Sequence, residues 1–310
     1  MAESKSIAFL FPGQGSQAVG MGKDFYDRYP KVKEWFDRAE TVLDFDLREI
    51  CFNGPEEKLK QTRFTQPALF VQSSLVTALL AEKEIGPGAV AGHSLGELSA
   101  LACAGAMSFE NGLQLVRERA RVMQETAVKH PGMMAAIIGL SSEEVSAVCQ
   151  ESNASGVVVP ANFNSPEQTV ISGSKEGVAK AIELSKARGA KRTIELAVSG
   201  AFHSPLMQDA QDRFQQVLAK TEFQNARIPV YSNVTAGPVT AVSEIPQLLA
   251  MQLTHSVRWV ETIRNMIRDG IRLFIEVGSG KVLSGLVKRI APDVEIRTCG
   301  TVEELNAILS

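Results

Sequence analysis

The stretch Gly92-His93-Ser94-Leu95-Gly96-Glu97 predicts a serine held on a sharp turn between a strand and a helix. Residues 88–91 form a short apolar run before it, and residues 95–104 after it are rich in small apolar side chains. That order is typical of a buried strand that feeds a buried helix. The flanking glycines let the backbone pass close to itself and expose a strained nucleophilic hydroxyl. An ordinary glycine turn matches the same pattern, so the rest of the chain must decide.

Strand-like and helical segments alternate along the chain around this turn. We expect strands at residues 7–11, 228–233 and 272–277, and helices at residues 24–43, 66–84 and from 112 to 129. Alternation of this kind favours a parallel sheet with helices on its faces, so the predicted fold class is α/β.

A second pattern begins after the His130-Pro131-Gly132 break. Its order is strand, helix, strand, strand, helix, strand, with strands predicted at residues 133–140, 157–160, 168–172 and 191–198. That order is typical of a ferredoxin-like fold. We therefore expect a larger α/β subdomain made of residues 1–130 and 199–310, with a ferredoxin-like subdomain, residues 131–198, inserted into it.

Composition limits the classes of partner and the compartment. The net charge of -3 gives no overall reason to expect a nucleic acid or an anionic membrane as a partner. Four widely spaced cysteines, with no histidine cluster nearby, indicate neither a disulfide framework nor a metal site. The apolar run that stops at Pro12-Gly13 is too short for a signal peptide, and polar residues interrupt the apolar segment 67–81. We expect a monomeric cytoplasmic protein that needs no metal or cofactor.

A serine nucleophile requires a base, and the chain has four histidines. His130 lies in a proline-glycine break, which indicates a solvated loop residue, and His255 has the pattern of a helix-end or packing residue. The side chain of His93 diverges from that of its neighbour Ser94 at a sharp turn. His203 follows an apolar strand and precedes a helix that begins near Pro205, so it is the candidate base, with an exposed loop histidine as the alternative.

No acidic residue stands out as a third member of a triad. Asp209 and Asp212 have the spacing of the polar face of the following helix. A backbone carbonyl is therefore the expected partner that orients the imidazole.

Two further features bear on the chemistry. The turn Pro12-Gly13-Gln14-Gly15-Ser16-Gln17 can direct backbone N–H groups at a developing oxyanion, and a phosphate loop is the weaker alternative because its spacing is not met. A charged helix carries Arg117, Arg119 and Arg121, any of which could bind a substrate carboxylate bidentately. A solvated helix face explains the same charges, and spacing alone does not choose among the three.

Taken together, these residues resemble a known family over nearly the whole chain. The chain is similar to the malonyl-CoA:acyl carrier protein transacylases of type II fatty acid synthesis, and to the related acyltransferase domains of polyketide synthases. The resemblance rests on the motifs at residues 11–17, 65–68, 92–97, 162–166, 232–234, 252–253 and 276–278. It implies an α/β-hydrolase-like larger subdomain with a parallel-sheet core.

The resemblance also implies a role for individual residues. Ser94 matches the nucleophile, His203 the base, and Arg119 the arginine that binds the free carboxylate of malonate. The backbone N–H groups of Gln14 and Leu95 match the oxyanion hole, and the main-chain carbonyl of Gln252 matches the acceptor for the second imidazole nitrogen. Residues around the acyl group correspond to His93, Met123, Asn162 and Phe202.

The implied reaction is a double displacement. A malonyl group passes from malonyl-CoA to Ser94, and from there to the phosphopantetheine thiol of holo acyl carrier protein, which supplies fatty acid chain elongation. The aromatic side chain of Phe202 is expected to restrict room for a branched acyl group, although one methyl group changes binding by only about 1–3 kcal/mol. A serine thioesterase would use the same turn with water as the acceptor, and a noncatalytic carrier-binding module is disfavoured because Ser94 and His203 are both present.

Overall fold

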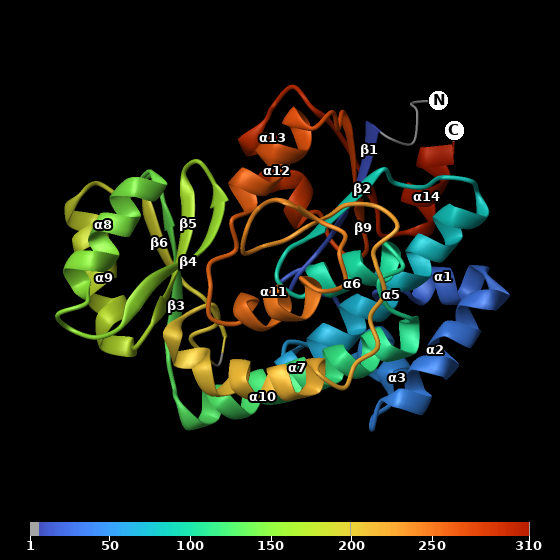
Figure 1. Cartoon of the computed structure of the whole chain (residues 1–310), viewed down its shortest axis with the longest axis horizontal. Coiled ribbons are helices and arrows are strands. Elements are labelled where there is room, and N and C mark those ends of the chain that lie inside the picture. The colour runs from blue at the N-terminus through green and yellow to red at the C-terminus, as the bar shows by residue number, and fades with distance from the viewer. Residues whose placement is uncertain (1–5, 199, 310) are drawn as a thin grey trace.

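A six-stranded sheet runs through the larger part of the molecule (Figure 1). The computed structural model describes residues 6–198 and 200–309. Neighbouring strands are parallel except at one edge, where the last pair is antiparallel. The strand order is β10 (Glu295–Cys299), β9 (Leu273–Val277), β1 (Ile7–Phe11), β2 (Ala89–Gly92), β7 (Val230–Tyr231) and β8 (Pro238–Val239). The predicted α/β class with a parallel-sheet core is confirmed.

Both faces of the central strands β1 and β2 are buried, because these two strands are apolar throughout. In β1 the side chains of Phe9 and Phe11 belong to one core, and those of Ala8 and Leu10 to another. The second core is completed by the helices α12 (Trp259–Arg268) and α13 (Val282–Ile290).

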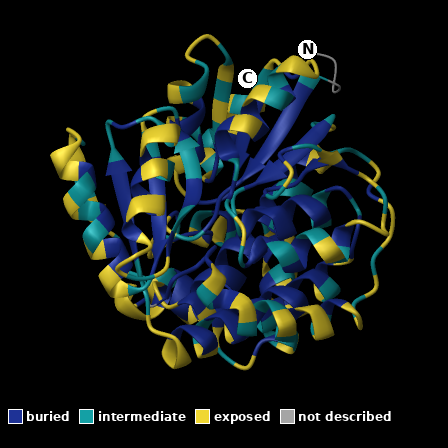
Figure 2. Ribbon diagram, turned by 60° about the vertical axis from the view of Figure 1, so that its left-hand side comes forward, coloured by how far each residue is buried: buried dark blue, intermediate teal, exposed yellow. Residues whose placement is uncertain are grey.

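The remaining helices of the larger part all contribute side chains to the first core. They are α1 (Lys23–Arg28), α2 (Pro30–Val42), α3 (Leu47–Asn53), α4 (Glu56–Leu59), α5 (Thr62–Glu82), α6 (Gly96–Cys103), α7 (Phe109–Lys129), the 3-10 helix η2 (Pro205–Met207), α10 (Gln208–Leu218), α11 (Ile245–Gln252) and α14 (Val302–Leu309). Buried and exposed residues alternate along the helices of the molecule (Figure 2).

A four-stranded antiparallel sheet forms the smaller lobe, at the left of Figure 1. Its strand order is β4 (Val158–Ser165), β5 (Gln168–Gly173), β3 (Met133–Ile138) and β6 (Arg192–Glu195). The helices α8 (Ser142–Ser152) and α9 (Lys175–Ala187) cover one face, where Ala135 and Ile137 of β3 enter a third core. The opposite face carries Met134 and Ala136 into the core of the larger body. Hydrogen bonds between Val257 and the backbone of Ala161 and Phe163 also join the two parts.

Helix α5 is the one described helix long and apolar enough to cross a membrane, and 78% of its most apolar window is buried inside the protein. The sequence predicts this buried helix but begins it at residue 66, whereas it begins at Thr62. Burial of Phe64 and Gln66 outweighs the backbone hydrogen bond that Pro67 removes. The side chain of Gln124 accepts the N–H of Arg63 near the start of the helix.

Candidate active site

The Ser94 turn joins β2 to α6 at the carboxyl edge of the large sheet. Ser94 has a φ of 52°, in the left-handed region that non-glycine residues seldom adopt. A Cβ at Gly92 would lie 1.9 Å from the carbonyl carbon of Gly96, and a Cβ at Gly96 would lie 2.0 Å from the oxygen of Phe11. Only glycine fits at these two positions, so the close backbone approach that the sequence predicts is present.

His203 lies beside Ser94. Its Nε2 atom is 2.8 Å from the Ser94 Oγ, and its Nδ1 atom is 2.8 Å from the main-chain oxygen of Gln252, the last residue of α11. A carbonyl oxygen only accepts, so Nδ1 carries the ring proton and Nε2 accepts from the serine hydroxyl. This is the geometry of a nucleophile and its base, with a carbonyl in the place of the usual acid.

The environment of His203 keeps its imidazole neutral. The side chain is buried, and burial together with the positive charge of Arg119 lowers its pKa to about 3. The unprotonated ring is the form that can accept a proton at neutral pH.

Arg119 is fully buried on the inner face of α7. Its Nη2 atom donates to the Ser94 Oγ at 3.1 Å and to the Gln252 Oε1 at 2.7 Å, and its Nη1 atom donates to the Gln66 Oε1 at 2.8 Å. Its Nε atom is buried without a hydrogen-bond partner among the described residues. Burial lowers the pKa of Arg119 to about 10, which leaves the guanidinium charged at neutral pH.

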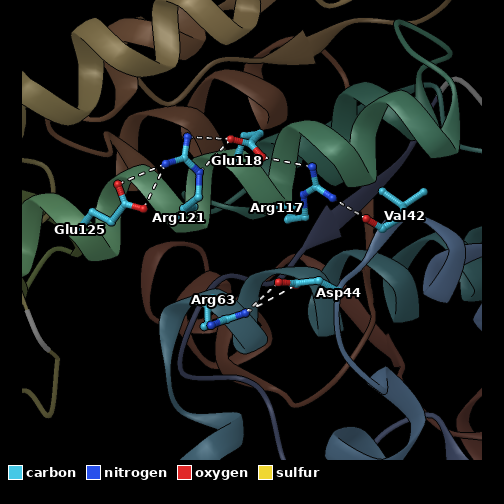
Figure 3. Close-up of polar contacts among 7 residues, drawn as sticks. All are labelled: Val42, Asp44, Arg63, Arg117, Glu118, Arg121 and Glu125. Atoms are coloured by element: carbon cyan, nitrogen blue, oxygen red, sulfur yellow. Dashed lines mark hydrogen bonds and ion pairs between the residues drawn. The ribbon is translucent and has the colours of Figure 1, made fainter.

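The other two arginines of this helix lie elsewhere, because residues two positions apart on a helix point to nearly opposite faces. Arg117 donates to the Val42 oxygen and pairs with Glu118, and Arg121 pairs with Glu118 and Glu125 (Figure 3). These side chains line a separate cavity of about 500 Å3 on the outer face of α7. Of the three arginines, only Arg119 reaches Ser94.

The glycine-rich loop after β1 lies against the Ser94 turn. The N–H of His93 donates to the Phe11 oxygen, and a Cβ at Gly13 would lie 2.4 Å from the His93 oxygen. Within the described part of the chain, the backbone N–H groups of Gln14 and Leu95 have no acceptor. Two backbone donors near the nucleophile are the components of an oxyanion hole.

The four other predicted substrate-contacting residues are arranged differently. The Nε2 atom of His93 is 2.8 Å from the Asn164 Oδ1, and burial lowers the pKa of His93. The Met123 sulfur is 3.6 Å from Nε2 of Gln66, which links it to the arginine. Asn162 and Phe202 are both 6% exposed, and neither is hydrogen-bonded to Ser94. His130 and His255 are exposed at helix ends, as the sequence predicts.

Three polar residues of the site were given no role by the sequence. Gln66 binds Arg119, Asn233 accepts the N–H of Ser94 at 2.7 Å, and Glu97 accepts from the side chain of Gln252 at 2.6 Å. Each lies in a quoted motif. A carboxylate inside the small apolar segment 95–104, and a polar residue at the start of an apolar helix, are signals that could have identified Glu97 and Gln66.

Glu97 is 3% exposed, and burial raises its pKa to about 7 against the opposing effect of its hydrogen-bond donors. Among the described residues, no group of three or more His, Cys, Asp or Glu side chains could hold a metal ion. Around Ser94 the site presents a hydroxyl, an imidazole, a guanidinium and backbone amides.

Comparison with known proteins agrees with this arrangement. Residues 8–300 match the acyl transferase domain family. The chain is 46% identical over 285 residues to the malonyl CoA-acyl carrier protein transacylase of Bacillus subtilis, covering 92% of this chain and 90% of that protein. It is 42% identical over 303 residues to the Escherichia coli K12 protein of the same name, covering 97% of each chain.

Solved structures give the same result. The malonyl CoA-acyl carrier protein transacylase of Coxiella burnetii superposes with a TM-score of 0.95 at 42% identity, covering 98% of this chain and 97% of that one. A malonyl-transacylase solved in complex with a type II polyketide synthase acyl carrier protein gives a TM-score of 0.95 at 40% identity, covering 98% and 99%. The chain therefore belongs to the acyl transferase family and, within it, to the malonyl-CoA:acyl carrier protein transacylases.

Proposed function

We propose that this chain transfers the malonyl group of malonyl-CoA to the phosphopantetheine thiol of holo acyl carrier protein through a malonyl-Ser94 ester, and so supplies fatty acid chain elongation. The observation that carries the proposal is the buried guanidinium of Arg119, whose Nη2 atom is 3.1 Å from the Ser94 hydroxyl, which is itself 2.8 Å from Nε2 of His203. A buried cation beside a nucleophile favours an acyl group that carries its own carboxylate.

In the first half-reaction Ser94 Oγ attacks the thioester carbonyl carbon. His203 Nε2 takes the hydroxyl proton, and the main-chain carbonyl of Gln252 stabilises the resulting imidazolium through Nδ1–H. The carbonyl oxygen becomes an oxyanion, which the backbone N–H groups of Gln14 and Leu95 stabilise. The C–S bond then breaks, and the imidazolium returns its proton to the departing thiol of coenzyme A.

The second half-reaction repeats these steps with the carrier's thiol as the nucleophile. His203 accepts the thiol proton, the sulfur attacks the ester carbonyl of malonyl-Ser94, and Ser94 regains its hydroxyl proton as the ester bond breaks. Because coenzyme A leaves before the carrier's thiol reacts at the same site, the kinetics are those of a double displacement.

Arg119 binds the malonyl carboxylate during both steps. Its Nε–H has no partner among the described residues, and one Nη2–H donates to the Ser94 Oγ while the other donates to Gln252. The malonyl carboxylate takes the place of the Ser94 Oγ as acceptor, so that Nε–H and this Nη2–H bind it in parallel. The carboxylate supplies the acceptor that Nε lacks. This bidentate pairing holds the acyl group while coenzyme A departs and the carrier enters.

The proposed acyl pocket is bounded by His93, Met123, Asn162 and Phe202. Phe202 directly precedes the base, and its buried ring restricts the room for a methyl branch on the malonyl group. The predicted preference against methylmalonyl groups follows from this position, with the modest size expected of a single methyl group.

We also propose the subdomain organisation and the state in which the chain acts. The strand order and the helices of residues 131–198 support a ferredoxin-like subdomain within an α/β-hydrolase-like body. Residue 199, where the sequence predicts the return to the larger subdomain, lies outside the described residues. Exposed large apolar side chains, such as Val19, Val128 and Val282, come from separate segments, which supports a monomer. The net charge of -3 supports the proposal that the chain acts in the cytoplasm without a nucleic acid or an anionic membrane as a partner.

The test follows the fate of the malonyl group with malonyl-CoA and holo acyl carrier protein. We expect malonyl-carrier to form faster than free malonate with the native protein, and neither product with Ser94→Ala. Free malonate formed at the same rate with or without the carrier would identify a thioesterase and overturn the proposal.

A further inference from the structure

Glu97 has a buried carboxylate that is hydrogen-bonded to neither Ser94 nor His203, although its backbone N–H donates to the Ser94 carbonyl oxygen at 3.1 Å. The carboxylate is instead bonded to residues that contact Ser94 and Arg119. Its Oε2 atom accepts from Nε2 of Gln252 at 2.6 Å and from the backbone N–H of Asn233 at 3.1 Å. Asn233 in turn accepts the N–H of Ser94 and donates to the Gly92 oxygen at 2.7 Å. Glu97 therefore lies where the nucleophile turn and the segment that carries Gln252 meet.

The side chain of Gln252 connects this carboxylate to the arginine. Its Nε2 atom faces two acceptors: the Glu97 Oε2 atom, which also accepts the N–H of Asn233, and the Ser94 carbonyl oxygen at 3.0 Å. Its Oε1 atom therefore faces Arg119 Nη2, a group that only donates. If the amide turned over, Nε2 would face the guanidinium, two donors would oppose one another, and the arginine would be displaced from Ser94.

We propose that Glu97 is a positioning residue: by accepting from Gln252 it fixes the orientation of that amide, which holds the guanidinium of Arg119 where a carboxylated acyl group needs it. We call this chain of hydrogen bonds from Glu97 through Gln252 to Arg119 the relay. The inference rests on the proposed function, because it assigns the preference for malonyl over acetyl groups to the relay. Glu97 itself contacts no reacting atom.

A comparison of malonyl with acetyl transfer distinguishes a displaced Arg119 from a general loss of stability. Acetyl transfer uses Ser94, His203 and the oxyanion donors but has no carboxylate for Arg119 to bind. Malonyl transfer uses all of these and the arginine. The ratio of kcat/KM for malonyl-CoA to kcat/KM for acetyl-CoA, with holo acyl carrier protein as acceptor, therefore reports the arginine's position and cancels a general loss of folded or active protein.

The decisive variants are Glu97→Met, which removes the acceptor at similar volume, and Glu97→Gln, which keeps an acceptor oxygen. We expect the malonyl-to-acetyl ratio to fall about tenfold or more in Glu97→Met and to stay within about threefold of native in Glu97→Gln. Gln252→Met removes the middle of the relay and leaves the main-chain carbonyl, so it should lower the ratio as Glu97→Met does. Gln252→Met therefore tests the proposal even if Glu97→Met fails to fold.

A double-mutant cycle checks that the effect passes through the arginine. In the Arg119→Ala background, Glu97→Met should change the ratio no further, because the group that the relay positions is gone. Glu276→Met is the matched control, since Glu276 is a fully buried carboxylate that accepts from Leu283 and Ser284 at the start of α13. It should lower stability and leave the ratio unchanged.

Three results would overturn the inference: an unchanged ratio in both relay variants, an equal fall in Glu97→Gln and Glu97→Met, or an additive cycle. Failure of the proposed function gives a different result, because the native protein would then transfer no malonyl group to the carrier.

Discussion

At the scale of single residues, the arrangement around the Ser94 hydroxyl explains both its reactivity and its selectivity. The oxygen lies between a neutral base, His203, and a buried cation, Arg119. In the proposed mechanism the base removes the hydroxyl proton, and the backbone N–H groups of Gln14 and Leu95 stabilise the oxyanion that develops on the substrate. The same cation makes the site suited to an acyl group that carries a carboxylate.

Replacement of Arg119 by alanine should therefore impair malonyl transfer selectively. We expect kcat/KM for malonyl-CoA to fall roughly 100-fold, the loss of about 3 kcal/mol from a charged bidentate contact, while acetyl transfer changes less than about tenfold. Steady-state kinetics with both thioesters measure this. Arg117→Ala is the matched control on the outer face of α7, and an equal fall of both activities in Arg119→Ala would contradict the assignment.

The buried state of His203 makes a prediction about stability and pH. Its pKa is about 3 in the folded chain and about 6.5 when unfolded, so the unfolded state binds the proton first as the pH falls. The stability it provides is complete above pH 6.5 and declines below it. Between pH 7.5 and 5, the free energy of unfolding should fall by about 1–2 kcal/mol more in the native protein than in His203→Gln.

Urea unfolding of both proteins at several pH values measures this difference. If the free energy of unfolding depends on pH in the same way in both proteins, His203 has an ordinary pKa in the folded state. The imidazole would then be more hydrated than its burial indicates.

The roles at the site could be predicted from the sequence only in part. Ser94 and His203 follow from local patterns, because glycine spacing and a loop histidine have recognisable signatures. Arg119 could not be separated from Arg117 and Arg121 by spacing, and only the family resemblance selected it. No local pattern assigns Glu97 a role, because its partners, Gln252 and Asn233, lie more than 130 residues away in the chain.

At the scale of elements, the turn between β2 and α6 depends on the absence of side chains at two positions. Gly92→Ala should cost about 3 kcal/mol or more and abolish acylation of Ser94, since the new Cβ would overlap the backbone of Gly96. Thermal unfolding and acylation by malonyl-CoA measure the two effects.

Gly285→Ala in α13 provides the control, because its Cβ would have no heavy atom within 4 Å. It should stabilise the protein by about 0.5–1 kcal/mol, as alanine does in helices, and leave acylation unchanged. A Gly92→Ala protein with native stability and activity would show that the turn tolerates a side chain and contradict the strained geometry.

Elements differ in how well the sequence predicts them. The apolar strands β1 and β9 and the helix α7 follow from periodicity, but α7 begins three residues before Gly112 because Ser108 caps it through the N–H of Asn111. The short helices α3 and α4 do not follow from periodicity, because one or two turns are too short to show a repeating apolar face, and Asp46 is the one local signal at the start of α3.

At the scale of the whole molecule, the buried apolar side chains form three separate hydrophobic cores. The core between the small sheet and its two helices is separate from the two cores of the large sheet. Ile171→Ala truncates a fully buried side chain of the small core and should lower the local free energy of unfolding by about 2–5 kcal/mol. Hydrogen exchange should accelerate mainly in β3 to β6, while β1 and β2 keep their protection.

Phe274→Ala, in the core under α12 and α13, is the matched change in the larger body and should give the opposite pattern. Equal loss of protection in both sheets with either variant would mean that the two parts unfold as one unit, through their shared contacts at Val257.

The central claim concerns the covalent intermediate, and intact-mass spectrometry tests it most directly. The native protein and Ser94→Ala are mixed with malonyl-CoA, and holo acyl carrier protein is then added. We predict a malonyl adduct on the native protein alone, which passes to the carrier faster than it hydrolyses. An adduct on Ser94→Ala, or transfer to the carrier without any adduct on the native protein, would contradict the mechanism.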